Sequence, residues 1–311
     1  MRTLLITTIG IIPILLGMHF LYAWTDPEFV KQSKEVTNKT FYLNVPFFIG
    51  RTIFYFALWA VLAWKLLSLS AEQDVTGDPD GAIRNRMKRW SAPGLVLFMF
   101  STSWAFIDWI MSLEPAWYST VHPWLFTIGQ VLLTYSFAVA LLVIFSKTRP
   151  FADVLSFQHF NDLGNLMLAF TMFWTYLSIA QFMIVWHENL PEEIPWYIRR
   201  FSNGWGYLAF FIAMFHFFVP FFLLLMRFIK RNPKYLFGVA IWMICIRMLD
   251  VFWVVIPAFR QRYFSVSWID IAAILAIGGI WLSFFIWRLK TRTLLPLHDP
   301  RLGYHTLESE A

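Results

Sequence analysis

FQHFNDLGNLMLAFTMFWTYLSIAQFMIVWHENLPEEIPWYIRRFSNGWGY, residues 157–207, is the stretch that decides the fold class. Between about residues 163 and 186 it contains no Asp, Glu, Lys or Arg. More than twenty uncharged and mostly apolar residues in a row predict a helix that crosses a membrane. His159 and Asp162 precede this helix, and His187 and Glu188 follow it. These polar groups are therefore expected at the two faces of a bilayer.

The composition of the whole chain also predicts an integral membrane protein. Of its 311 residues, 59% are hydrophobic, 20% are aromatic and only 14% are charged, whereas soluble proteins have about a quarter charged residues. The single cysteine, Cys245, excludes a disulfide framework, cysteine-ligated iron–sulfur clusters and a CxxCH haem attachment in this chain. The formal charge of +6 comes from basic residues scattered over loops, which favours a role in topology and lipid contact over nucleic-acid binding.

We predict an all-α polytopic protein with about eight transmembrane helices in one domain, residues 1–294, followed by a polar cytoplasmic tail, residues 295–311. Each predicted helix has about twenty residues or more, enough to cross a hydrocarbon core of about 30 Å. The first follows Arg2 like a signal peptide, but its length and the lack of a small-residue cleavage site favour a retained helix. The predicted spans are 4–24, 41–69, 93–113, 122–146, 163–186, 205–228, 234–258 and 269–289.

The lysines and arginines predict the orientation. Sixteen of them lie at the N-terminus, in the loops after the second, fourth and sixth predicted spans, or in the C-terminal segment, and seven lie on the other side. Because cytoplasmic loops carry the excess of basic residues, both termini are expected in the cytoplasm.

Five ionisable residues are expected within the outer half of the membrane, judged from a rise of about 1.5 Å per helical residue. Such groups usually face the interior of a helix bundle and mark a functional site. Arg247 and Asp250 share a helix face and could form a buried ion pair that fixes helix packing. Alternatively, Asp108, His216, Arg247 and Asp250 line a hydrated proton path or a quinone headgroup pocket. The five residues are Arg51, Asp108, His216, Arg247 and Asp250.

On the cytoplasmic side, His159 and Asp162 are candidates for proton uptake. A competing interpretation makes Asp162 the N-cap of the long helix. Hydroxyl groups at Thr171 and Ser178 continue inward, where they could relay protons or simply bond between helices. Haem b is disfavoured because two histidines at matched depth are needed and only His216 is deep.

A short pattern occurs twice in the chain. Asp108 is followed seven residues later by Pro-Ala-Trp (115–117), and Asp250 is followed seven residues later by Pro-Ala-Phe (257–259). The offset is four predicted helices, as expected for two related four-helix bundles.

Four motifs together resemble the F subunit of alternative complex III. This subunit belongs to the polysulfide-reductase-C-like (NrfD-like) membrane proteins. The motifs are LNVPFFIGRT (43–52), SLEPAWYST (112–120), NLPEEIPWYIRR (189–200) and IRMLDVFWVVIPAF (246–259). Members of the family usually have about ten spans in paired four-helix bundles. LLGMHFLYAWTDPE (15–28) resembles their third span, so we expect the first bundle to be incomplete.

The resemblance implies a subunit of a bacterial respiratory quinol:cytochrome c oxidoreductase, or one with another high-potential acceptor, in the inner membrane. Its expected partners are a homologous C subunit, iron–sulfur and c-type haem subunits, and lipids, but no nucleic acid. Menaquinol or another quinol is the possible ligand, and the chain is expected to bind no metal or haem itself. The resemblance points to Asp108, His159, Asp162, Arg247 and Asp250 as the polar residues of a proton pathway.

We therefore expect the chain to support proton translocation or quinone access without carrying electrons or supplying a catalytic residue. A scaffold subunit whose charges form structural pairs is the alternative. A stand-alone transporter is less favoured because no span is clearly interrupted by glycine and proline in its middle. The outer loop is expected to dock a peripheral subunit through Glu192, Glu193, Arg199 and Arg200, although a simple solvated loop would have the same composition.

Overall fold

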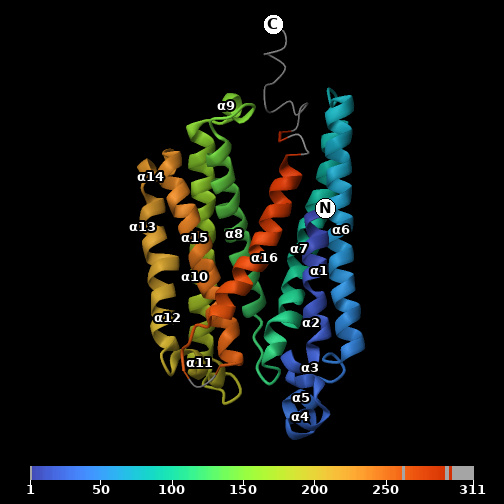
Figure 1. Cartoon of the computed structure of the whole chain (residues 1–311), viewed down its shortest axis with the longest axis vertical. Helices are drawn as coiled ribbons and strands as arrows, with labels where there is room; N and C mark the ends of the chain where they lie inside the picture. Colours follow the sequence, from blue (N-terminus) through green and yellow to red (C-terminus); the bar gives the residue numbers. More distant parts are fainter. Residues whose placement is uncertain (1, 261–262, 291–293, 296–311) are drawn as a thin grey trace, which may run out of the picture. The chain divides into compact units, whose positions relative to one another are not determined.

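The computed structural model describes residues 2–260, 263–290 and 294–295, and the elements it contains are helices (Figure 1). The elements that make up the candidate membrane spans are α6 (Val45–Thr76), α7 (Ala82–Trp109), α8 (His122–Phe145), α10 (Phe157–Glu188), α12 (Trp205–Ile212), α13 (Val219–Leu225), α15 (Pro233–Val255) and α16 (Trp268–Leu289). The short helices are α1 (Arg2–Gly10), α2 (Ile12–Leu16), α3 (Met18–Leu21), α4 (Pro27–Gln32), α5 (Lys34–Thr37), α9 (Phe151–Val154), α11 (Ile194–Phe201) and α14 (Arg227–Arg231). A π-helical segment, η3 (Ala213–Phe218), joins α12 to α13.

Seven helical segments among the described residues are long and apolar enough to span a membrane. They correspond to the second through eighth predicted spans, with α12, η3 and α13 together forming one of them. The chain is thus an all-α, multi-pass membrane protein. The predicted polar tail begins at residue 295, and residues 296–311 lie outside the described part of the chain.

The first predicted span, 4–24, is not a single long helix. It is divided into α1, α2 and α3, and its longest apolar helical stretch runs only from Ile6 to Leu16. Pro13 has no N–H to bond the preceding turn, and Gly17 ends α2. The prediction of one helix rested on hydrophobicity, which does not show where a proline or a glycine interrupts the backbone hydrogen bonds.

Helix α10 begins six residues earlier than predicted. Ser156 is its N-cap, and His159 completes a capping box by accepting the Ser156 backbone N–H at Nδ1 over 3.1 Å. The interpretation of Asp162 as the N-cap is therefore wrong, because Asp162 lies in the second turn of the helix. At the other end, Asn189 in the left-handed conformation terminates α10.

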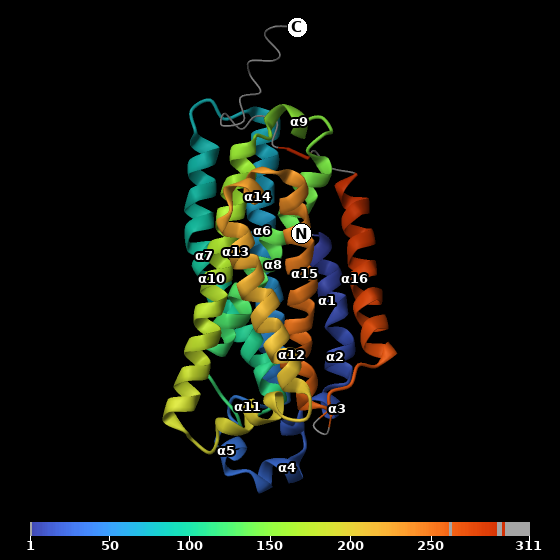
Figure 2. The same ribbon diagram turned by 90° about the vertical axis from the view of Figure 1, so that its left-hand side faces the viewer.

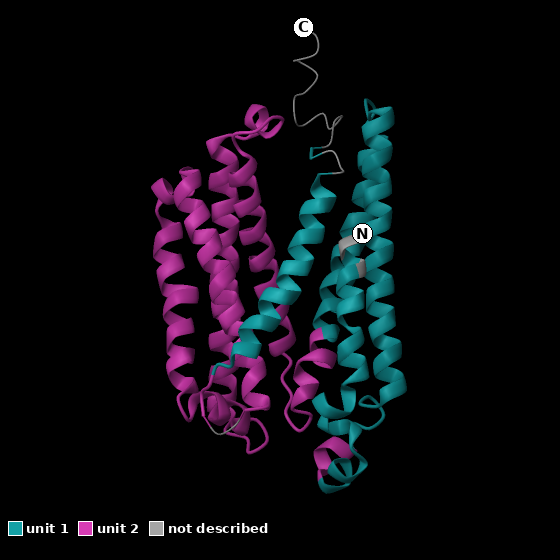
Figure 3. Cartoon of the chain, in the orientation of Figure 1, with its two compact units in different colours: residues 1–32, 38–105, 266–311 teal, residues 33–37, 106–265 magenta. Residues whose placement is uncertain are grey.

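The chain forms two compact units (Figure 3). The first comprises residues 1–32, 38–105 and 266–311 and contains α6, α16, most of α7 and the N-terminal helices. Within it, Trp59 Nε1 donates to Ser101 Oγ over 2.9 Å and joins α6 to α7. Arg51 is held by the Tyr42 carbonyl oxygen at 3.0 Å and lies over the Tyr42 and Phe47 rings.

The second unit comprises residues 33–37 and 106–265 and contains four of the spans. Helix α8 packs against both α10 and α15, and α13 packs against α10. The core between them is mostly aliphatic and sulfur-containing side chains, among them Leu132, Val139, Met167, Leu236 and Met243. Few of the side chains that face outward are polar, as expected where the surroundings are lipid.

Helices α12 and α13 follow one another through η3 as one rod (Figure 2). Pro220, near the start of α13, has no backbone N–H. In the i→i+5 pattern of a π segment, Phe215 O would accept the bond from residue 220. Trp242 Nε1 on α15 donates to this carbonyl over 2.8 Å instead. The side chain thereby satisfies a backbone group within the membrane region.

The contact between Gly164 on α10 and Lys230 on α14 gives a test of how these two helices pack in the second unit. A methyl group at Gly164 would lie 2.7 Å from Lys230 Cγ, so we expect Gly164→Ala to destabilise the protein by about 1–3 kcal/mol through overpacking. Gly50→Ala is the matched control, since nothing lies within 4 Å of a methyl group there. Thermal unfolding in detergent measures both, and a Gly164→Ala protein as stable as the control would contradict the packing described.

Candidate functional site

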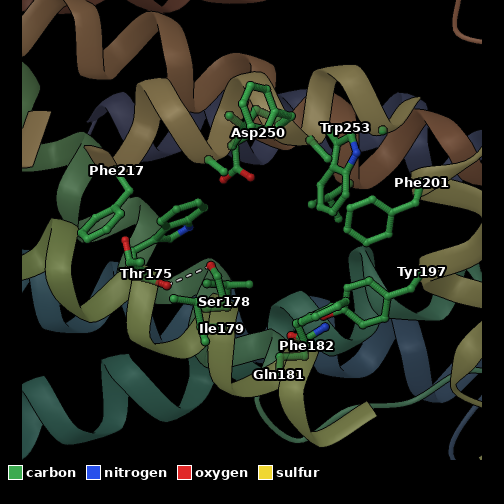
Figure 4. Close-up of a pocket in the computed structure, with 18 of the residues that line it drawn as sticks. Thr175, Ser178, Ile179, Gln181, Phe182, Tyr197, Phe201, Phe217, Asp250 and Trp253 are labelled. Atoms are coloured by element: carbon green, nitrogen blue, oxygen red, sulfur yellow. Dashed lines mark hydrogen bonds between the residues drawn. The ribbon is translucent and has the colours of Figure 1, made fainter. Parts of the chain in front are cut away.

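A cavity of about 430 Å³ lies inside the second unit, between α10, α11, α12 and α15 (Figure 4). Its wall is mostly aromatic and aliphatic, with a few polar side chains. The Asp250 carboxylate points into it from α15, and Gln181 lies on the opposite side, on α10. A largely apolar cavity of this size with a few convergent polar groups is typical of a small-molecule site.

Arg247 and Asp250 form an ion pair in the wall of this cavity. Arg247 Nη1 donates to Asp250 Oδ2, and both side chains are almost fully buried. Arg247 Nη2 also donates to Phe126 O on α8 over 3.3 Å, and its guanidinium lies 5.1 Å from the centre of the Phe126 ring. The pair predicted from the i, i+3 spacing therefore forms, and it joins α15 to α8.

Gly129 on α8 makes room for the guanidinium. A methyl group at this position would overlap Cζ and both terminal nitrogens of Arg247. The glycine therefore lets a charged side chain pass between two packed helices, where the backbone of α8 supplies an acceptor.

His216, in the π segment η3, is fully buried and close to this pair. Its ring centre lies 4.0 Å from that of Trp174 on α10. Neither ring nitrogen has a hydrogen-bond partner among the described residues, and the same holds for Nε of Arg247. Three polar atoms of His216 and Arg247 are thus available to bind water or a ligand within the bundle.

A second charged cluster lies at the end of the unit where α11 is found. Glu114 accepts hydrogen bonds from Arg199 Nη1 and Arg200 Nη2, each over 2.6 Å. Arg200 also donates to Val254 O over 2.6 Å and to Trp196 O over 3.0 Å. Burial lowers the pKa of Arg200 to about 10, an effect that Glu114 opposes, so Arg200 stays charged at neutral pH.

Aromatic side chains surround this cluster. The Trp196 ring stacks on Trp117 with centres 4.8 Å apart, and the Arg200 guanidinium lies 3.8 Å from the centre of Trp196. His122 contacts both indole rings edge to face and is almost fully buried. Burial also raises the pKa of the Tyr197 hydroxyl, which therefore stays neutral. The cluster packs α11 across the end of the cavity.

The structure brings together three of the seven residues predicted for a proton path or quinone pocket. Arg247 and Asp250 line the cavity, and Arg247 lies within electrostatic range of His216. Asp108 is fully buried in the same unit but does not line the cavity. Arg51 belongs to the first unit.

His159 and Asp162 are exposed in the first two turns of α10. Asp162 accepts a hydrogen bond from Gln158 Nε2 over 2.9 Å. Further along the helix, the hydroxyls of Thr171, Thr175 and Ser178 donate to backbone carbonyls four residues earlier. These hydroxyls bond within their own helix, not between helices as the packing interpretation expected for Thr171 and Ser178.

The four residues predicted to dock a partner differ in position. Glu192 is exposed, while Glu193 and Arg199 are half-buried. Arg200 is only 2% exposed and turns inward to Glu114, so the docking prediction does not hold for Arg200. Arg200 instead holds α11 against the bundle, because it bonds Glu114 and the carbonyl oxygen of Val254.

Several residues of the site were not singled out by the sequence. Glu114 lies within the motif SLEPAWYST, but no pattern in the sequence indicated that its carboxylate binds Arg199 and Arg200. Gln181 is an uncharged polar residue in a mostly apolar helix, and its Oε1 is buried without a hydrogen-bond partner in the described part of the chain. Gly129 also gave no signal, since a glycine in an apolar helix is common. Among the described residues, no group of three His, Cys, Asp or Glu side chains could hold a metal ion.

Comparison of the chain with protein-family models finds no match, and comparison with curated proteins finds none either. The resemblance to the F subunit of alternative complex III therefore stays a prediction.

The carboxylate of Glu114 should be needed for stability. In Glu114→Gln, buried Arg200 loses its charge partner, which typically costs about 3–5 kcal/mol. We expect a large fall in the thermal unfolding temperature in detergent. Glu28→Gln is the control, because the Glu28–Lys31 pair is 72% exposed on both sides and contributes little. Equal effects of the two substitutions would show that the Glu114 cluster is not a main source of stability.

Glu193 gives a pH dependence of the opposite sign from the usual carboxylate. Burial, with Glu188 and Glu192 nearby, raises its pKa above the ordinary value of 4.5. The folded protein therefore binds this proton more tightly than the unfolded chain, and stability falls as the pH rises through and above 4.5. We expect Glu193→Gln to raise the unfolding temperature slightly at pH 7 and to leave it unchanged at pH 4. A stabilisation of the same size at both pH values would exclude a titration effect.

Proposed function

We propose that the chain is a membrane subunit of a bacterial respiratory quinol:acceptor oxidoreductase, and that its cavity receives the quinol headgroup. The observation that carries this proposal is the cavity of about 430 Å³ inside the second unit, with the Asp250 carboxylate and the unpartnered Gln181 Oε1 in its wall. Quinols are flat, apolar molecules with a hydroxyl at each end of the ring, and both hydroxyls need acceptors.

The shape and chemistry of the cavity fit such a molecule. Asp250 and Gln181 lie on opposite sides of the space (Figure 4), so each can accept a hydrogen bond from a different hydroxyl. Phe201, Tyr197 and Trp253 supply aromatic surface between them. The volume lies within the range of about 300–1,000 Å³ that is usual for small-molecule sites.

Access from the bilayer is supported by the residues at the border of the cavity. Ile179 and Phe182 on α10 and Phe210 on α12 line the cavity and are also exposed on the outside of the chain. A ligand with an isoprenoid tail can therefore enter between α10 and α12 while its tail stays in lipid. A substrate that enters from water would instead need a polar mouth.

Asp250 is the residue of this chain that takes up a proton when a quinol is oxidised. Its carboxylate lies at the cavity, and Arg247 stabilises the charged form before the proton arrives. His216 is fully buried in the same unit and both of its ring nitrogens lack a hydrogen-bond partner among the described residues, so it is our candidate for the next group that handles this proton. Oxidation of a quinol releases two protons and two electrons. Asp250 takes one proton, the second leaves to water from the hydroxyl on the Gln181 side, and both electrons go to a redox centre in a partner subunit, such as an iron–sulfur protein.

The topology and the partner surface complete the proposal. The excess of Lys and Arg lies in the first turns of α7, in the segment between α8 and α10, and in α14 with the start of α15, so this side is assigned to the cytoplasm. The segment with Glu192, Glu193 and Arg199 lies on the opposite side, where a peripheral electron-transfer subunit can dock. The four spans of the second unit are consistent with one complete four-helix bundle of the NrfD-like type.

Filling the cavity tests quinol binding without touching the ion pair. Ala209 lines the cavity, and we expect Ala209→Phe to weaken quinol binding about tenfold or more, since overpacking of this size costs about 1–3 kcal/mol. The measurement is the KM for a soluble quinol analogue, together with the quinone content, in the complex purified through a tag on this chain. Ala276→Phe, on an exposed face of α16, is the control. Unchanged quinone content and KM in Ala209→Phe would overturn the site.

Asp250→Asn separates a proton acceptor from a scaffold. If Asp250 accepts the proton, turnover should fall about 100-fold or more, as is typical when a general base is removed, while quinone remains bound. If the Arg247–Asp250 pair only fixes helix packing, folded Asp250→Asn protein should keep both turnover and proton release. Thermal unfolding shows whether the variant is folded, because removing one partner leaves Arg247 buried and unpaired.

A further inference from the structure

A second hollow of the second unit lies away from the quinol cavity, on the outside of the bundle between α13 and α15. It has a volume of about 310 Å³ and is lined by apolar side chains. On one side, Phe215, Val219 and Leu223 follow one another at intervals of four residues. On α15, Tyr235, Val239 and Trp242 lie on one face of the helix. The groove therefore runs along the helices, the direction in which acyl chains lie in a bilayer.

The two ends of the groove differ in chemistry. The end deeper in the bundle is closed by the hydrogen bond from Trp242 Nε1 to Phe215 O. The other end is formed by Ile229 and Tyr235, which lie on α14 and in the first turn of α15. Phe228 and Tyr235 are in ring contact there, with centres 5.0 Å apart. Tyrosine at this level is typical of the interface between lipid tails and headgroups.

The segment at this open end is strongly basic. Residues 227–234 contain four basic side chains and no acidic one. Arg227, Arg231 and Lys234 are exposed, while Lys230 is buried and donates to Asn165 Oδ1 over 2.6 Å. In the described part of the chain, none of the four forms an ion pair with a carboxylate. Burial and the neighbouring Arg227 also lower the pKa of Lys230, as expected where positive charge accumulates without a counter-ion.

We propose that this groove binds one anionic phospholipid, with an acyl chain between α13 and α15 and the phosphate at Arg231 and Lys234. An apolar groove alone would accept any lipid, so the unpaired positive charge at its open end selects the anionic class. Basic sites beside membrane helices on the cytoplasmic side bind such headgroups. The larger number of Lys and Arg residues on this side of the predicted spans assigns the open end of the groove to the cytoplasmic side. The inference is independent of the quinol site.

Gly238 allows the groove to be filled without disturbing other contacts. It lines the groove, and nothing lies within 4 Å of a methyl group built there. Gly238→Leu is therefore expected to fill the space an acyl chain would occupy. Gly278→Leu on α16 is the matched control, since a methyl group there also meets nothing within 4 Å.

The experiment measures lipid retained by the full chain. The protein is reconstituted in nanodiscs of equal parts phosphatidylglycerol and phosphatidylcholine, extracted in mild detergent, washed and examined by native mass spectrometry. We expect wild type and Gly278→Leu to retain one phosphatidylglycerol and Gly238→Leu to lose it. Retention by Arg231→Gln/Lys234→Gln should fall about 25-fold, because each basic side chain near an anionic surface contributes about fivefold.

Three outcomes would overturn the proposal. Equal retention by Gly238→Leu and wild type would mean that the lipid is adventitious. Equal retention of phosphatidylcholine and phosphatidylglycerol, or full retention by the double variant, would show that charge plays no part. Thermal unfolding of each variant confirms that a lost lipid does not reflect a lost fold.

Discussion

Charges buried between membrane helices need partners, because lipid supplies no hydrogen bonds. The Arg247–Asp250 pair meets this constraint within one helix, but the guanidinium still needs further acceptors. It finds one at Phe126 O, which is reachable because Gly129 has no side chain. This requirement fixes the spacing of α8 and α15. On the other side of the pair, α10 and α12 leave the cavity into which Asp250 points.

The same constraint explains the end of the unit where α11 lies. Glu114, Arg199 and Arg200 satisfy one another, and Arg200 also donates to the carbonyl oxygens of Trp196 and Val254. A short helix with two arginines would otherwise turn both to solvent. Because Arg200 is turned inward, it holds α11 across the cavity, while Arg199 stays half-buried.

Hydrophobicity was enough to predict seven spans, because a membrane helix must satisfy its backbone internally and so shows as a long apolar run. The i, i+3 spacing was enough to predict the Arg247–Asp250 pair, since both residues lie on one helix. Contacts between distant segments were not predictable in this way. Glu114 and Arg200 are separated by two complete spans, α8 and α10, and their connecting segments, and no local pattern links them. The break at Pro13 and Gly17 was also missed, because an apolar average does not register backbone hydrogen bonds.

The motif that occurs around both Asp108 and Asp250 predicts similar backbone structure at the two sites but not similar side-chain contacts. Asp108 and Asp250 are both buried, and each helix is followed by a 3₁₀ turn, at Met111–Leu113 and Ile256–Ala258. Their surroundings nevertheless differ, because Asp250 has an arginine one turn before it whereas the equivalent position beside Asp108 is Ala105. Asp250 can therefore face a cavity as a paired carboxylate, and Asp108 cannot use the same arrangement. Equivalent backbone positions thus give one residue a part in the proposed proton transfer and leave the other outside the cavity.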